Sequence, residues 1–198
     1  MKKIIFLIVA SIVCSISLTQ PIHAKEQNTL SVENYVSAIT EEAKKYNVDV
    51  WINDYETLGE ITQDKIDQAV KNVQLFATTI HTEENNTNLH SSISTYASTK
   101  TRTGYFDIVA APGSATINVD ITASVSSGNK ISSISRKNAY QAGVAFFFSS
   151  WTTHSISTTM NSPSNGYVKA VVTGYAVFNY GVTSYASNMT GSCLIDFR

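Results

Sequence analysis

The side chains best suited to acid–base or metal chemistry are few and scattered in this sequence. After residue 24 it holds three histidines, His81, His90 and His154, and one cysteine, Cys193. No two of them stand at the spacing that brings metal ligands together on a helix, and no HExxH, GxSxG, P-loop or GxGxxG pattern occurs. We therefore expect no catalytic motif, no cofactor and no metal site, and no motif identifies a family.

One set of residues nevertheless suggests an enzyme. In His154, Cys193 and Arg198 the chain resembles the sortase transpeptidases, and the resemblance implies a thiolate nucleophile, a histidine acid and an arginine that stabilises the oxyanion. The resemblance covers these three residues only. Thr190 to Ser192 stand where that family has a TLxTC-like strand, and the arginine lies closer to the cysteine than in the family. The sequence favours the alternative, in which Cys193 is a small buried side chain on a strand.

An acidic segment, VDVWINDYETLGE at residues 48–60, lies between two predicted helices and invites comparison with a calcium-binding loop. If the loop starts at Asp49, Trp51 stands where an oxygen ligand is needed, and Asp54 stands where the tight turn requires glycine. If it starts at Asp54, Lys65 takes the twelfth position, which needs a carboxylate. Neither register fits, so we interpret the segment as a short strand followed by a solvated acidic loop.

The stretch GVAFFFSSWTTHS, residues 143–155, concentrates aromatic side chains in a part of the chain rich in serine and threonine. Neighbouring residues of a strand face opposite sides, so the alternation predicts Phe146 and Phe148 in the core. It places Phe147 and Trp151 on the opposite face. A bulge at the two serines that follow Phe148 would exchange the later positions.

Three interpretations of the opposite face remain open. The predicted helices could pack over Phe147, which the burial of apolar surface favours. Alternatively, an aromatic platform of Phe147, Trp151, Tyr167 and Tyr175 could bind an extracellular glycan or protein. In the third interpretation, alternating hairpins around NVDITASVSSGNKISSIS, residues 118–135, insert into a membrane, as in a pore-forming-type protein.

The first 24 residues are typical of a secretory signal peptide. Lys2 and Lys3 precede an apolar run from Ile4 to Leu18, and Ala24 supplies the small residue at a cleavage site. We expect cleavage after Ala24, which leaves an exported bacterial protein with no stable membrane span. Its single cysteine cannot form an internal disulfide, so the fold depends on packing.

Residues 25–81 are predicted to form a helical region. Ser31 and Thr62 are suitable N-caps, and Asn47 is a suitable left-handed stop after the first helix. Each cap precedes an apolar stripe at helical spacing. The stripes comprise Val32, Tyr35, Val36, Ile39 and Ala43 in the first helix, and Ile66, Ala69, Val70, Val73, Phe76, Ala77 and Ile80 in the second.

The rest of the chain is predicted to be β-structure. Residues 82–103 are polar and are expected to form a linker. From residue 104 to residue 198 the apolar period is two, and turn residues separate six or seven segments. The predicted fold class is therefore α+β: a two-helix region followed by an antiparallel β-sandwich or small barrel.

Charge is unevenly distributed along the chain. Residues 25–90 carry five lysines and twelve acidic residues, a net charge of −7, whereas residues 91–198 carry a net charge of +4. We expect the two parts to attract each other. No dense basic cluster is interleaved with aromatic residues, which argues against nucleic acid as a partner. The sequence thus favours a monomeric, exported, non-catalytic binding protein with an unknown extracellular partner.

Overall fold

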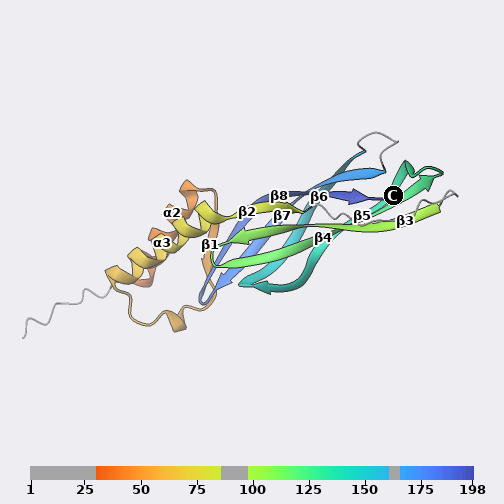
Figure 1. Cartoon of the computed structure of the whole chain (residues 1–198). Coiled ribbons are helices and arrows are strands. Elements are labelled where there is room, and N and C mark those ends of the chain that lie inside the picture. The colour runs from red at the N-terminus through yellow and green to blue at the C-terminus, as the bar shows by residue number, and fades with distance from the viewer. Residues whose placement is uncertain (1–29, 86–97, 161–165) are drawn as a thin grey trace, which may run out of the picture.

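The computed structural model describes residues 30–85, 98–160 and 166–198, so the predicted signal peptide lies outside the described residues (Figure 1). In chain order the elements are α2 (Val32–Lys45), β1 (Asp49–Ile52), the 3-10 helix η1 (Glu56–Leu58), α3 (Gln63–Thr79), β2 (His81–Asn85), β3 (Ser98–Ala110), β4 (Gly113–Ser126), β5 (Lys130–Phe146), β6 (Phe148–Met160), β7 (Tyr167–Tyr180) and β8 (Thr183–Asp196).

Both predicted helices are present and begin at the predicted caps. The Ser31 hydroxyl accepts a hydrogen bond of 3.3 Å from the backbone N–H of Asn34, whose side chain accepts one from the backbone N–H of Ser31. The Thr62 hydroxyl accepts from the backbone N–H of Lys65 at 3.3 Å. Asn47 follows α2 in the left-handed conformation, with φ of 55°. These polar contacts satisfy backbone groups that helix ends leave without partners.

The eight strands of the described residues form two four-stranded sheets. Sheet A has the order β1-β8-β7-β6, sheet B has the order β2-β3-β4-β5, and neighbouring strands pair antiparallel. In β4 every second residue from Gly113 to Val125 is buried, which marks the inner face of sheet B. The fold is therefore α+β with an antiparallel two-sheet body, which confirms the predicted class.

The two sheets meet differently along their two sides. On one side β2 lies beside β8, where the Thr82 hydroxyl donates to the carbonyl of Thr190 at 3.0 Å and the Ser192 hydroxyl donates to Glu84 at 2.9 Å. On the other side the chain passes directly from β5 of sheet B to β6 of sheet A at Phe147. Consecutive strands β5 and β6 are thus the edge strands of different sheets.

Glycines allow large rings to lie against the opposite backbone inside the body. A β-carbon at Gly191 of β8 would lie 2.2 Å from ring atoms of Phe106 on β3. A β-carbon at Gly174 of β7 would lie 2.3 Å from the ring of Trp151 on β6. Both contacts are too short for any side chain, so the rings fill the space that glycine leaves.

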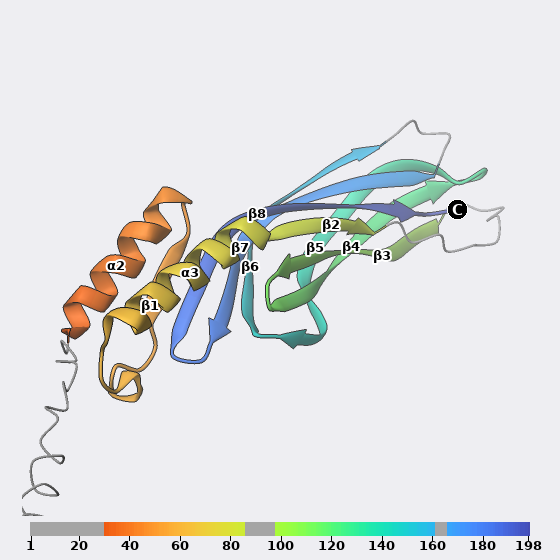
Figure 2. The same cartoon turned by 60° about the vertical axis from the view of Figure 1, so that its left-hand side comes forward.

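The helices cover one end of the body rather than one of its faces (Figures 1 and 2). Phe76 of α3 is fully buried and contacts the rings of Phe178, Tyr180 and Tyr185, with centroids 5.6, 6.2 and 5.3 Å away. This aromatic cluster joins α3 to the β7–β8 end of sheet A. Among the described residues, no helix combines the length and the apolar character that a membrane crossing requires.

The segment expected to be a polar linker is partly β-structure. Residues 82–85 belong to β2, which pairs with β3, and residues 98–103 form the first part of β3. The strand HTEEN pairs with β3 through its backbone, and its polar side chains make further hydrogen bonds, such as that of the Thr82 hydroxyl with β8. The remaining residues of the expected linker, 86–97, lie outside the described residues.

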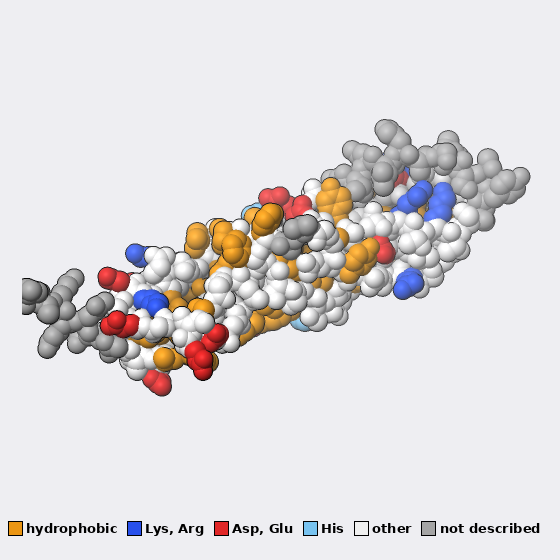
Figure 3. All heavy atoms as spheres, turned by 90° about the horizontal axis from the view of Figure 1, so that it is seen from below, with side chains coloured by type: hydrophobic (Ala, Val, Ile, Leu, Met, Phe, Trp, Pro, Cys, Tyr) orange, Lys and Arg blue, Asp and Glu red, His pale blue; other side chains and the backbone are white. Residues whose placement is uncertain are grey.

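Opposite charges gather at opposite ends of the molecule. Acidic side chains outnumber the lysines of α2 and α3 at the helical end, and a group of lysines and arginines lies at the far end of the strands (Figure 3). The expected attraction between the two parts therefore does not bring the acidic helices against the basic strands. A local exception is Lys169 of β7, whose ammonium lies 3.8 Å from the Glu84 carboxylate of β2.

Candidate functional site: an apolar corner

The four residues of the predicted aromatic platform lie in different places. Tyr167 lies at the start of β7, where the Arg198 guanidinium stacks 4.2 Å from its ring centroid. Tyr175 lies eight residues further along the same strand, roughly 26 Å away at 3.3 Å per residue. Trp151 faces the interior of the body, and Phe147 lies at the passage from β5 to β6. The structure does not bring these side chains into one surface.

Two of these side chains have internal partners. Trp151 makes an edge-to-face contact with Phe106, with centroids 6.1 Å apart, and its indole N–H donates to the Thr153 hydroxyl at 2.8 Å. The Tyr175 hydroxyl donates to the Asp49 carboxylate of β1. Burial, helped by this carboxylate, raises the pKa of Tyr175 to about 12. Both rings therefore stabilise the fold.

The prediction that Phe146 enters the core is wrong, whereas the prediction for Phe148 is confirmed. Phe148 is 9% exposed and packs against Phe178, but Phe146 is 64% exposed. The alternation fails because Phe147 adopts a left-handed conformation, with φ of 56°, and ends the strand. A register shift after Phe148 then places Trp151 on the inner face. The side chains of residues 144 and 145 lie outside those described.

The helices only partly cover Phe147. Its side chain is 51% exposed and contacts the ring of Tyr180 at a centroid distance of 5.5 Å. Leu75 of α3 lies nearby and is itself 49% exposed. The preferred sequence interpretation, in which the helices pack over Phe147, is therefore not met: Leu75 of α3 and Phe147 line one cavity, and half of the Phe147 side chain is exposed.

Apolar side chains around two cavities that share Pro112 form a surface region that we name the apolar corner. We define it by Leu75 of α3, Pro112 of the β3–β4 turn, and Phe146 and Phe147 at the passage between the sheets. The turn and the passage are held together tightly, since a β-carbon at Gly113 would lie 2.6 Å from the Phe146 carbonyl oxygen. Three separate segments of the chain therefore build the corner.

Two cavities flank the corner on either side of Ala111 and Pro112. The smaller has a volume of about 340 Å³ and the larger about 540 Å³. Neither is lined by Asp, Glu, Lys or Arg, and His81 is the ionisable side chain besides tyrosine that lines them. The smaller is lined by Asn72, Leu75, Ala111, Pro112, Phe147 and Tyr180. The larger is lined by Thr78, Thr79, His81, Val109, Ala110, Ala111, Pro112, Gly113, Ser114 and Phe146.

The histidine at the larger cavity is held in place by its neighbours. His81 Nδ1 lies 2.7 Å from the Thr79 carbonyl oxygen and Nε2 lies 3.2 Å from a Glu83 carboxylate oxygen. These two acceptors, the carbonyl first, raise the pKa of His81 above its ordinary value. The side chain is exposed and has no nucleophile among its contacts, which are Thr79 and Glu83.

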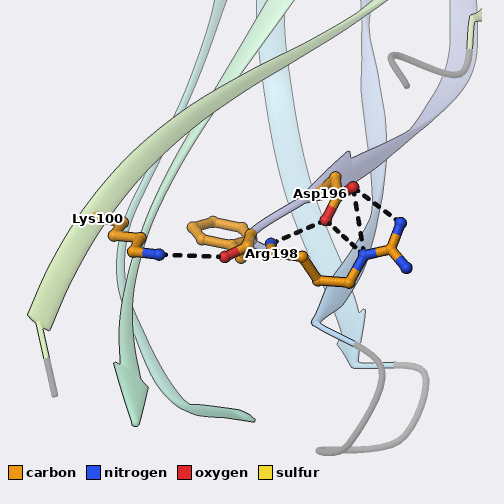
Figure 4. Close-up of polar contacts among 4 residues, drawn as sticks. Lys100, Asp196 and Arg198 are labelled. Atoms are coloured by element: carbon orange, nitrogen blue, oxygen red, sulfur yellow. Dashed lines mark hydrogen bonds and ion pairs between the residues drawn. The ribbon is translucent and has the colours of Figure 1, made fainter. Parts of the chain in front are cut away.

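The three residues of the sortase-like set have unrelated environments. Cys193 is fully buried on the inner face of β8, and burial raises the pKa of its thiol to about 12. Its neighbours across sheet A are Ala170 and then Thr158, so His154 lies two strands away and four residues further along. Arg198 hydrogen-bonds Asp196 at 3.0 Å, beside the contact of Lys100 with the carbonyl of Phe197 (Figure 4). A buried, protonated thiol is a poor nucleophile.

The structure also bears on the metal and calcium expectations. Within the residues it describes, no group of three or more histidine, cysteine or acidic side chains could hold a metal ion. In the acidic segment, an Asp54 carboxylate oxygen accepts from the backbone N–H of Glu56 at 2.9 Å, which closes a local turn before η1. The segment folds as a strand, a turn and a short 3-10 helix.

Comparisons of this chain with protein-family models, with curated proteins and with solved structures find no match. The candidate site therefore depends on the geometry alone. Sequence reasoning missed Leu75, Pro112 and Phe146. A signal for Leu75 exists, since this large apolar residue lies off the buried stripe of its helix.

Proposed function

We propose that this protein is an exported, non-catalytic binding protein that acts at the cell surface or outside the cell, and that it binds through the apolar corner. The observation that carries the proposal is the exposure of Phe146 and Phe147, at 64% and 51%. The chain buries other phenylalanines completely, including Phe76, Phe106 and Phe178. Contiguous exposed apolar side chains on a soluble body are typical of interaction sites.

Export is supported by the pattern of residues 1–24, with its positive start, its apolar run and a small residue at position 24. A non-catalytic role is supported by the state of the side chains that could do chemistry. Cys193 is buried and protonated, and the exposed His81 contacts Thr79 and Glu83. Neither arrangement provides an activated nucleophile beside a base.

The composition of the corner indicates the chemistry of the partner. Leu75, Pro112, Phe146 and Phe147 offer no side-chain hydrogen-bond donor or acceptor. A glycan site needs such groups beside its rings, because buried sugar hydroxyls without partners cost free energy. The corner therefore suits an apolar or amphipathic partner better than a glycan. The platform of Trp151, Tyr167 and Tyr175 has less support, because its members are dispersed.

The test compares cell association of the parent with that of a corner variant. The full chain is expressed in a Gram-positive host, the exported protein is collected and labelled, and its sedimentation with intact bacterial cells and with cultured animal cells is measured. In the variant, Phe146→Ser removes one ring. Phe147→Asn removes the other and supplies a residue that tolerates the left-handed backbone. We expect association to fall at least about tenfold.

Tyr55→Asn serves as the matched control, because Tyr55 is 53% exposed and lies beside α2, away from the corner. The control should associate as the parent does. Equal association of the corner variant and the parent, or no association of the parent with either kind of cell, would contradict the proposal. N-terminal sequencing of the exported protein tests cleavage after Ala24 in the same experiment.

A second candidate is a membrane-active protein of the pore-forming type. The observation that favours it is an uncharged run in β5 and β6: from Asn138 to Met160 there is no Asp, Glu, Lys or Arg. Both strands are edge strands with largely exposed side chains. Release of a trapped dye from lipid vesicles tests this candidate, and vesicles that stay sealed at saturating protein would contradict it.

A further inference from the structure

We propose that the partner of the apolar corner is the surface of a lipid membrane, into which Phe146, Phe147 and Leu75 insert at the boundary between headgroups and acyl chains. The inference rests on the proposed function, in which the corner is the binding surface, and adds the chemistry of the partner. It describes docking at the surface and requires no crossing of the membrane.

The shape of the corner supports a fluid partner. Phe146 and Phe147 are 64% and 51% exposed where the chain turns from one sheet to the other, and Leu75 of α3, which is 49% exposed, lines one cavity with Phe147. Between these projections lie the two cavities beside Pro112, of about 340 and 540 Å³. Phenylalanine and leucine side chains that enter the acyl boundary are typical of peripheral membrane binding. Flexible acyl chains can fill the cavities between the rings. A rigid protein partner would need projecting side chains of complementary shape.

The charges around the corner fit a lipid surface. The cavity linings contain neither carboxylates nor ammonium or guanidinium groups, and the uncharged run of Asn138 to Met160 includes both exposed rings. The three inserted side chains, Leu75, Phe146 and Phe147, therefore carry no charge to desolvate, while His81, which contacts Glu83, lies in the lining of the larger cavity. The helical end, which is formed by the N-terminal part of the chain, is rich in acidic side chains (Figure 3). The corner is thus the uncharged part between two charged ends.

The scarcity of hydrogen-bonding side chains favours lipid over protein. Protein interfaces carry about one hydrogen bond per 100–200 Å² and a polar rim. Asn72 is the amide side chain of the smaller cavity, and Thr78, Thr79, His81 and Ser114 are the polar residues that line the larger one, but the exposed side chains of Leu75, Phe146 and Phe147 offer no hydrogen-bonding group. Binding to a lipid surface requires apolar contact by the most exposed rings and no directed hydrogen bonds.

The experiment measures flotation of the exported protein with vesicles of phosphatidylcholine, and with vesicles that also contain phosphatidylglycerol, at physiological and at high salt. The basic end of the molecule would bind anionic vesicles through charge alone, and salt suppresses that binding. Binding by the corner should occur on phosphatidylcholine and should persist at high salt. Phe146→Ser with Phe147→Asn should lower the partition coefficient at least about tenfold, and Tyr55→Asn should leave it unchanged.

A second readout locates the inserted residue. Phe146→Trp should show a blue-shifted additional emission on binding and quenching by lipids brominated in the upper acyl chain. Tyr55→Trp, the matched control, should show neither change. Quenching at position 146 is a signature that a merely destabilised variant would not reproduce.

Three results would overturn the inference. One is binding restricted to anionic vesicles and abolished by salt, because it would assign the contact to the basic end. The second is binding that is equal in the parent and the corner variant. The third is no vesicle binding while cell association remains dependent on the corner, which would leave the proposed function standing with a protein partner. If cell association is also independent of the corner, the proposed function fails as well.

Discussion

Three adjacent phenylalanines have three different environments. Phe148 packs inside the body, 5.0 Å from the ring centroid of Phe178, and Phe146 is exposed. Phe147 holds a left-handed conformation, which costs a residue with a β-carbon about 1–2 kcal/mol. The other non-glycine residues described with positive φ are Asn47 and Asn129, whose side chains tolerate it. A phenylalanine at this position costs stability, which fits a role for its ring outside the fold.

The environments predict different effects of truncation. Phe148→Ala should lower the free energy of unfolding by about 3 kcal/mol, because it leaves a cavity between the sheets. Phe146→Ala should change it by less than about 0.5 kcal/mol, since the ring is exposed. Urea denaturation followed by circular dichroism measures both. Similar losses at the two positions would mean that Phe146 packs in the interior.

The thiol of Cys193 should be unreactive in the folded protein. Burial raises its pKa to about 12, so at pH 8 it is protonated as well as inaccessible. In a chain with Cys14→Ser, a disulfide reagent should modify Cys193 at least about 100-fold more slowly in native buffer than in urea. Raising the pH toward 12 should speed the reaction. Rapid modification at pH 8 in native buffer would support a sortase-like thiolate instead.

At the scale of elements, the ring of Phe76 attaches α3 to sheet A. Phe76→Ala should cost about 3–5 kcal/mol, because Phe76 is fully buried against Phe178, Tyr180 and Tyr185. The matched control is the neighbouring residue: Leu75→Ala should cost less than about 0.5 kcal/mol, since Leu75 is half-exposed. Denaturation midpoints of the two variants decide this. An equal effect would show that the helix docks through both side chains.

The close approach of β8 and β3 makes a second prediction for the elements. Gly191→Ala should destabilise the body by about 1–3 kcal/mol, because the new methyl group would overlap the ring of Phe106. Thr190→Ala, at an exposed position next to it, should change the stability by less than about 0.5 kcal/mol. Thermal denaturation distinguishes them. A neutral Gly191→Ala would mean that the ring of Phe106 moves freely.

Much of the fold could be predicted from local patterns. Caps at Ser31 and Thr62 and a period of 3.6 defined the helices, and a period of two defined the long strands. The sequence did not predict β2, because its polar residues show no alternation of apolar and polar side chains. The sequence did not predict the apolar corner, because the alternation of faces applies only within an uninterrupted strand. Phe147 interrupts the strand with a backbone conformation that phenylalanine rarely adopts. Tertiary contact among three segments has no local signal.

At the scale of the whole molecule, shape and charge run along the same axis. The helices and most carboxylates lie at one end, together with the lysines of α2 and α3, and a group of lysines and arginines lies at the far end of the strands. Strand β5 alone has 17 residues, which is about 56 Å of extended chain. The sequence showed that the two parts carry unequal charge, and from this we expected them to attract each other. The net charge of a segment does not tell how far it lies from another segment in the fold.

Small-angle scattering of the exported protein tests this shape. A compact chain of this length has a radius of gyration of about 16 Å, and the elongated body should exceed that value clearly. Extrapolation to zero concentration should give the mass of a monomer. A value near that of a compact sphere would contradict the axial arrangement of helices and strands, and a mass that grows with concentration would indicate that the corners of two copies meet.

Around the passage from β5 to β6, some positions are constrained by packing and others are free to vary. Phe148 is buried in the body, and Gly113 is fixed by it, because a β-carbon at Gly113 would meet the Phe146 carbonyl oxygen and the ring of Phe178. Phe146, one position from Phe147, carries no such constraint. For the binding that we propose, mutation at that position would alter affinity while the scaffold keeps its packing. The fold thus offers a place where new specificity can arise at little risk to folding.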